Sequence, residues 1–327
     1  MDETNYSGAL IFWIYILAAF FFSYMVIQSI ISIRPGKDER QKTKGSDSGF
    51  IWLFGALAGL SFTTLSYNML TVLAHSYQAW SLSHGMAANI SPAQIWHWST
   101  TSTLFRDFAE AIVFDSIRYF WAQSALLATL WLCMYMGTEG SHRQIPHLWA
   151  FFGLSQILPI SFAQNLFYVA LLRQPSGRKS AVIPQNFLLA VVGIYCGCLL
   201  VAAQAAQTAR GAWLTTTIMV ARLFLLSPLF IVEVFNSPGP NIPGRPSGQR
   251  VDGRQALRIV TAAAMICTTI QLHVLGQRKA NYTDLFNGLF SHPAVTTLGC
   301  DLVLTVVGYG FWTLRTSLAP QDRMKTS

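Results

Sequence analysis

Charged residues are scarce in this 327-residue chain: they make up only 11% of it, whereas 52% of the residues are hydrophobic. A soluble protein carries roughly 25% charged residues, so too few are present here to cover a water-facing surface of this size. The mean hydropathy of +0.40 points the same way. The composition excludes a soluble or disordered protein and predicts a multi-pass membrane protein.

Cysteines and the motifs of common cofactor sites are also scarce. The five cysteines lie within apolar runs and form no Cys-x-x-Cys pair, so neither a disulfide framework nor a zinc site is indicated. The sequence lacks Gly-rich phosphate loops, His-Glu-x-x-His, Gly-x-Ser-x-Gly and aspartate-rich motifs for magnesium diphosphate. We therefore expect no metal and no cofactor, and any chemistry should be driven by protons on a lipophilic substrate.

Eight apolar segments are long enough to cross a bilayer as helices, which takes about 20 residues each. The expected fold class is an all-α polytopic membrane helical bundle of about eight transmembrane helices, forming a single integral-membrane domain over residues 1–327. The segments are 9–33, 50–75, 119–137, 147–172, 183–206, 212–235, 256–275 and 294–316.

Basic residues gather in the loop 33–49, between the first two expected spans. Such loops remain in the cytosol, so this loop is expected to be cytosolic and the N-terminus lumenal. Basic residues in such a loop set the membrane topology and bind anionic lipid headgroups, which explains the net charge of +8. The expected partner is therefore the lipid bilayer and not a nucleic acid. Residues 317–327 form a polar tail, and the expected location is the endoplasmic reticulum membrane.

A short segment between the second and third expected spans, residues 102–115, is apolar yet acidic. It is too short to cross the bilayer, and Asp107, Glu110 and Phe114 share one helical face, so a short re-entrant or interfacial helix is expected. Either the carboxylates are solvated at the membrane surface, or two carboxyls one turn apart raise each other's pKa and one acts as a general acid. His97, between two tryptophans, is either a third member of that site or an aromatic-belt residue.

Ionisable residues inside apolar spans mark functional sites by default, because burying a charge is costly. Arg222 lies in the sixth expected span and Asp301 in the eighth. Arg222 needs a partner, and Asp301 is the candidate. Whether such a pair is a structural ion pair or part of a site stays open.

A polar stripe in the fourth expected span follows Pro159, which is expected to kink the helix. The stripe includes Gln164, Asn165 and Tyr168. These side chains either join helices by hydrogen bonds or line a pocket. Aromatic residues make up 13% of the chain, and ring faces such as those of Trp98, Phe108 and Tyr168 could stabilise a carbocation in a bound substrate.

Three stretches carry a family resemblance: 98–112 (WSTTSTLFRDFAEAI), 120–127 (FWAQSALL) and 145–167 (IPHLWAFFGLSQILPISFAQNLF). Together they resemble the fungal integral-membrane terpene cyclases of ascochlorin and ascofuranone type, and the related membrane proteins of paxilline-like indole-diterpene gene clusters. The resemblance is strong over about 95–170 and fades toward both ends, although His292-Pro-Ala and Asp301 also fit.

The resemblance implies a metal-free terpene cyclase, an isomerase or lyase of secondary metabolism, acting on a prenylated and epoxidised aromatic or terpenoid. A side-chain acid would protonate an epoxide or olefin, the chain would close, and a base would remove the last proton. By this analogy Asp107 and Glu110 are the acid pair, and Asp301 is a second acid or an orienting carboxylate. Gln164 and Asn165 become hydrogen-bond partners in the pocket, and association with other pathway enzymes is possible.

The alternative function is an accessory membrane protein or a transporter of a hydrophobic metabolite. A transporter would show duplicated halves and paired broken helices. Convergence of Asp107, Glu110 and Asp301 on one closed apolar cavity would favour the cyclase, and a continuous polar pathway across the bilayer would favour transport.

Overall fold

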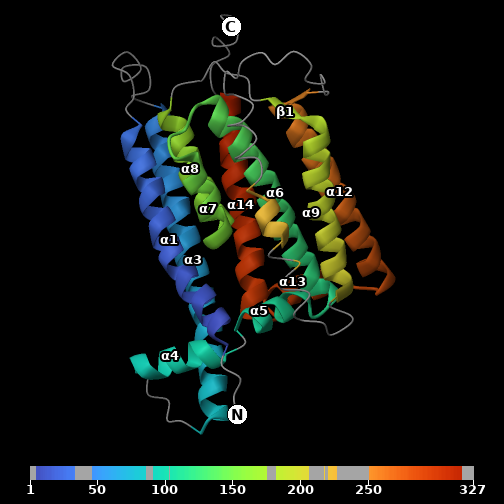
Figure 1. Ribbon diagram of the computed structural model, residues 1–327. Helices are drawn as coiled ribbons and strands as arrows, with labels where there is room; N and C mark the ends of the chain where they lie inside the picture. The colour runs from blue at the N-terminus through green and yellow to red at the C-terminus, as the bar shows by residue number, and fades with distance from the viewer. Residues whose placement is uncertain are drawn as a thin grey trace, which may run out of the picture.

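The computed structural model describes residues 5–33, 46–85, 91–102, 104–174, 182–205, 217, 220–226 and 250–318, and it is an all-α bundle with one minor sheet (Figure 1). The helices are α1 (Tyr6–Ser32), α3 (Ser46–Ser83), α4 (Pro92–Thr101), α5 (Leu104–Val113), α6 (Ser116–His142), α7 (Leu148–Ile157), α8 (Ile160–Arg173), α9 (Gln185–Ala205), α12 (Gly253–Gln277), α13 (Tyr282–Leu289) and α14 (Pro293–Leu318). Strands β1 (Val182–Pro184) and β2 (Arg250–Asp252) pair antiparallel, with Ile183 opposite Val251.

Five of the described helices are long and apolar enough to cross a membrane, which agrees with an integral membrane protein. They are Gly8–Ser32, Ser48–Ser83, Gln185–Ala203, Gly253–Gln277 and Pro293–Leu318. The all-α class is therefore confirmed, while the expected count of about eight spans is not. Expected spans 119–137 and 147–172 correspond to α6 and to the pair α7–α8, and 212–235 lies mostly outside the described residues.

Helix α6 holds the middle of the bundle together, and most of its side chains are buried. The Tyr119 hydroxyl donates to the carbonyl of Leu199 on α9, and Tyr195 on α9 donates to the carbonyl of Leu126 at 2.7 Å. Gln271 on α12 donates to the Ser116 carbonyl at 3.0 Å. Phenol and amide side chains thus join helices by bonding to backbone carbonyls.

The expected span 147–172 forms two helices that turn back on each other instead of one kinked span, because residues at the start of α7 and at the end of α8 lie at the same end of the bundle. Helix α7 ends at Ile157 and α8 begins at Ile160, with Leu158 and Pro159 extended between them. Proline has no N–H and clashes with the preceding turn, so the helix stops here. At about 1.5 Å per residue, neither half is long enough to cross a bilayer alone.

Short helices cover one end of the bundle (Figure 1). The predicted short helix in 102–115 is α5, and Asp115 follows it as the N-cap of α6, accepting from the N–H groups of Ile117 and Arg118 at 2.8 Å each. Helices α4 and α13, which the sequence analysis did not predict, lie near the same end.

Basic side chains mark the other end of the bundle. Arg143 follows α6 and donates to the Leu171 carbonyl near the end of α8, and Arg173 donates to the Ile30 carbonyl near the end of α1. Arg250 and Arg315 lie at this end as well, in β2 and in the last turn of α14. Of the predicted cytosolic loop 33–49, residues 34–45 lie outside the described residues, as do residues 319–327 of the predicted tail.

Candidate functional site

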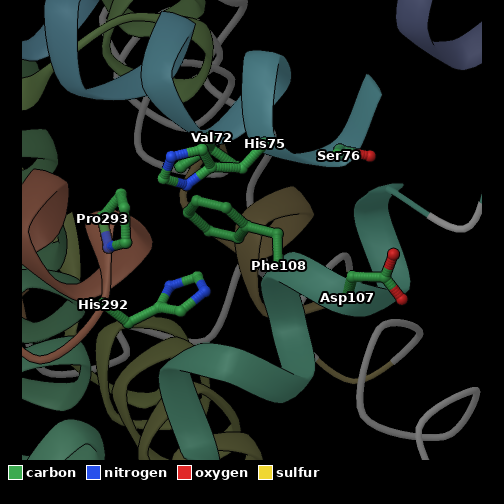
Figure 2. Close-up of a pocket in the computed structure, with 7 residues that line it drawn as sticks. All are labelled: Val72, His75, Ser76, Asp107, Phe108, His292 and Pro293. Carbon is green, nitrogen blue, oxygen red and sulfur yellow. The ribbon is translucent and has the colours of Figure 1, made fainter. Parts of the chain in front are cut away.

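A pocket of about 220 Å³ lies at the end of the bundle opposite the basic side chains, between α3, α5 and the start of α14 (Figure 2). It includes two residues predicted from the sequence, Asp107 and Phe108, and two histidines from other elements. Its lining residues are Val72, His75, Ser76, Asp107, Phe108, His292 and Pro293.

The Phe108 ring lies between the imidazoles of His75 and His292, and the Asp107 carboxylate points away from both (Figure 2). Asp107 is exposed and lies in the first turn of α5, where the helix dipole favours a negative charge. Val72, His75 and Ser76 are spaced i, i+3 and i+4, so α3 presents them on one face. The pocket thus combines an acid, two imidazoles and an aromatic face.

His292 is held rigidly at the start of α14. The Ala294 N–H donates to its Nδ1 at 3.1 Å, and the N–H groups of Val295 and Thr296 donate to its carbonyl at 2.9 and 3.0 Å. Burial lowers the pKa of this imidazole, and the charges of Arg118 and His75 lower it further. These surroundings favour the neutral form of the His292 imidazole.

Other candidates near the pocket do not line it. Glu110 is half-buried one turn after Asp107. Trp98 is buried in an apolar cluster with Val72 and Phe108. Of the two alternatives for His97, the structure does not place it in the pocket lining: its ring packs edge-on to Trp80, with centroids 5.3 Å apart.

Asp301 lies in a different place, at the break between α7 and α8. It is only 6% exposed, and its carboxylate accepts from the Ile160 N–H at 2.8 Å, the Ser161 N–H at 2.9 Å and the Ser161 hydroxyl at 2.6 Å. Asp301 therefore caps the N-terminus of α8 from another helix, where both the hydrogen bonds and the helix dipole favour a carboxylate.

Arg222 serves the other side of the break. Its Nη1 donates at 3.0 Å to the carbonyl of Gln156, near the end of α7. The same carbonyl accepts a hydrogen bond from the Tyr15 hydroxyl at 3.2 Å. Among the described residues no ion pair joins Arg222 to Asp301, so the predicted pairing is wrong. The positive charge of Arg222 lies at the C-terminus of α7, and the negative charge of Asp301 lies at the N-terminus of α8. Each charge therefore complements the dipole of the helix that it contacts.

The polar stripe of α8 faces α14. Gln164 Nε2 donates to the Tyr168 hydroxyl at 2.8 Å and to the Thr305 carbonyl at 3.2 Å, and Asn165 Nδ2 donates to the Ser161 carbonyl at 2.8 Å. Tyr168 stacks on Trp312, with centroids 4.6 Å apart and ring planes 3° from parallel. We call this contact between parallel helices, from Asp301 to Trp312, the α8–α14 seam.

Three buried polar atoms in the seam have no hydrogen-bond partner within the part of the chain that the structure describes: Gln164 Oε1, Asn165 Oδ1 and Thr305 Oγ1. Asn165 Oδ1 is packed onto the backbone of α14, because a Cβ added at Gly308 would lie 2.8 Å from it. The glycine permits this close approach.

The predicted site residues therefore fall into two groups. Asp107 and Phe108 line the pocket, while Asp301, Gln164, Asn165 and Tyr168 lie in the seam. Pro293 and Asp301 are eight residues apart on α14, about 12 Å of helix. The three candidate carboxyls do not converge on one cavity, and in the described residues no group of three or more His, Cys, Asp or Glu side chains is placed to hold a metal ion.

Sequence reasoning missed His75 and Ser76. They lie at the boundary of the expected span 50–75, whereas α3 continues to Ser83. The available signal was an ionisable side chain at the end of an apolar helix. His292 entered only through the family resemblance.

Comparison with protein-family models, with curated proteins and with solved structures finds no match for this chain. Its function is therefore argued from the residues and the geometry of the pocket.

Proposed function

We propose that the protein is a membrane-bound terpene cyclase of fungal secondary metabolism that closes rings in a prenylated, epoxidised aromatic or terpenoid substrate. The observation that carries the proposal is the pocket itself, which Asp107, an aromatic face and two imidazoles line at one end of an apolar helical bundle. A lipophilic substrate partitions into the bilayer, so a pocket at the end of the bundle can receive it from the membrane.

The acid in this proposal is Asp107. In this proposal the exposed side chain turns from its present direction toward the bound substrate, and an apolar substrate that covers the carboxyl removes water from it and favours its protonated form. The carboxyl then gives its proton to the epoxide oxygen, the C–O bond breaks, and the electrons of a neighbouring double bond close the ring. Loss of a proton from carbon ends the reaction, so substrate and product are isomers and no oxidant or reductant is consumed.

Phe108 has a separate role in the proposal. Its ring faces the pocket, and the negative face of an aromatic ring attracts a developing carbocation. Val72 and Pro293 supply apolar walls that exclude water, which would otherwise quench the cation. Asp301 is the orienting carboxylate here, because its oxygens accept three hydrogen bonds that hold α8.

The test is turnover in yeast microsomes that contain the chain. An epoxidised farnesyl phenol and an epoxidised geranylgeranyl indole are supplied, and products of unchanged mass but new retention time are sought by mass spectrometry. Asp107→Asn should lower the yield by roughly 10²-fold or more, because it removes the general acid. The matched control is Asp252→Asn, which removes an exposed carboxylate at the opposite end of the bundle and keeps a capping side chain. Equal yields from Asp107→Asn and the unaltered chain would refute the assignment.

A transporter or accessory protein is the second candidate, and the turn between the short helices α7 and α8, which lies beside charged side chains, favours it. Half-helix ends beside charged side chains form substrate sites in many transporters. If neither substrate is isomerised by well-folded protein, uptake of the same labelled compounds into proteoliposomes distinguishes transport from an accessory role.

A further inference from the structure

We propose that His292 is a fixed hydrogen-bond donor that binds the oxygen-bearing end of the ligand through its Nε2–H. The ligand class is an apolar molecule with one exposed oxygen acceptor, such as a phenol, ether or carbonyl. This class rests on the proposed cyclase function, but the role of His292 is independent of turnover.

The hydrogen bond to Nδ1 fixes the tautomer. The Ala294 N–H donates to Nδ1 at 3.1 Å, and an N–H can donate only to a ring nitrogen that carries no proton. In the neutral imidazole the proton is then on Nε2. Nε2 does not take part in the hydrogen bond with Ala294, so it can donate its proton to a ligand, and in this tautomer it cannot accept a hydrogen bond.

The surroundings of the His292 ring favour its neutral form. Arg118 from α6 and His75 from α3 disfavour a second proton, and burial lowers the pKa in the same direction. Asp115 pairs with Arg118 at 3.5 Å, and the Asp107 carboxylate points away from His292 (Figure 2). A neutral donor binds a neutral oxygen without the cost of burying a charge.

The backbone holds the ring in place before any ligand binds. His292 precedes a proline, which restricts its backbone, and its carbonyl accepts from two N–H groups of the first turn of α14. A preorganised donor spends little conformational entropy on binding. The rest of the lining beside it, Val72, Phe108 and Pro293, suits an apolar body.

The experiment measures binding with a ligand pair that cannot cyclise. The probes are tritiated hexahydrofarnesyl phenol, whose chain is saturated, and the same molecule without its hydroxyl, both tested on membranes containing the protein. The variants are His292→Phe, which removes the donor and keeps a ring, and His292→Gln, which keeps an N–H at similar reach.

His292→Phe should weaken binding of the phenol by about 3- to 10-fold, the value of one neutral hydrogen bond, and leave the deoxy compound unchanged. His292→Gln should retain most of the affinity. Equal effects on both probes would show that His292 only packs, and no effect on the phenol, or no saturable binding by the unaltered protein, would also overturn the proposal. Because the probes cannot react, loss of this discrimination is distinguishable from failure of the cyclase assignment.

Discussion

Asn165 places its Oδ1 close to α14 at Gly308, where the glycine leaves room for the amide. A Cβ at residue 308 would be 2.8 Å from that oxygen, which is closer than real Cβ atoms approach other atoms. Gly308→Ala should therefore make the buried Asn165 amide shift and strain its hydrogen bond to the Ser161 carbonyl, which destabilises the protein by about 1 kcal/mol. The melting temperature in detergent measures the loss.

Gly310, two residues further along α14, is the matched control, because nothing lies within 4 Å of a Cβ added there. Gly310→Ala should keep or slightly raise stability, since alanine is the better helix former by about 0.5–1 kcal/mol. If both variants melt alike, the room that Gly308 leaves for the Asn165 amide does not contribute to stability.

At the scale of residues, the sequence could predict which side chains are unusual but not what they touch. The polar stripe at Gln164 and Asn165 and the acidic Asp107 are visible because polar groups stand out in apolar runs. Their partners come from segments far away in the chain: Thr305, for example, is 141 residues from Gln164. No local pattern carries that pairing.

At the scale of elements, the break between α7 and α8 depends on Asp301. Its carboxylate accepts from two backbone N–H groups and one hydroxyl that would otherwise be buried without partners. Asp301→Ala should lower the free energy of unfolding by at least about 2 kcal/mol, because it removes a helix cap and strands these donors. Asp301→Asn, which keeps an acceptor, should lose less.

Thermal melting of the purified protein ranks these variants. The account is contradicted if Asp301→Ala melts like the unaltered chain, since the capping bonds would then contribute nothing to stability.

The sequence predicted most of the long helices and placed a distortion at Pro159. It did not predict that the helix ends here and a new one begins. The end of α7 and the start of α8 are stabilised by hydrogen bonds from Arg222 and to Asp301, which come from other parts of the chain. The count of about eight spans is not confirmed, since five of the described helices are long and apolar enough to cross a membrane. Apolar runs such as 147–172 are long enough to cross, yet here the run forms two short helices.

At the scale of the whole molecule, charge is distributed unevenly between the two ends. Arg143, Arg173 and Arg315 lie at the end opposite the pocket, whereas basic residues at the pocket end, Arg118, Arg278 and Lys279, are accompanied by the acidic Asp107, Glu110, Asp115 and Asp284. By the positive-inside bias we expect the end opposite the pocket to lie in the cytosol and the pocket at the lumenal face. The sequence predicted this orientation from the loop 33–49 alone. The end of the bundle at which the pocket lies could not be predicted, because its residues come from α3, α5 and α14 and meet only in the folded chain.

Cysteine labelling in sealed microsomes, whose cytosolic face is outward, checks the orientation. Gln255→Cys, near the basic end, should react with a membrane-impermeant maleimide at once, whereas Thr283→Cys, in α13 at the pocket end, should react only after permeabilisation. Both positions are exposed, and the unaltered chain gives the background from its own five cysteines. The reverse pattern would place the pocket in the cytosol.

The central claim is that chemistry takes place in the pocket at Asp107 and that the seam at Asp301 holds the helices. The most direct measurement compares the yield of isomerised product per amount of folded protein for Asp107→Asn and Asp301→Asn in the same microsomes. The account predicts that Asp107→Asn loses turnover while keeping its melting temperature, and that Asp301→Asn keeps turnover in proportion to the protein that folds. Full turnover by Asp107→Asn together with an inactive but stably folded Asp301→Asn would contradict it and move the acid to the seam.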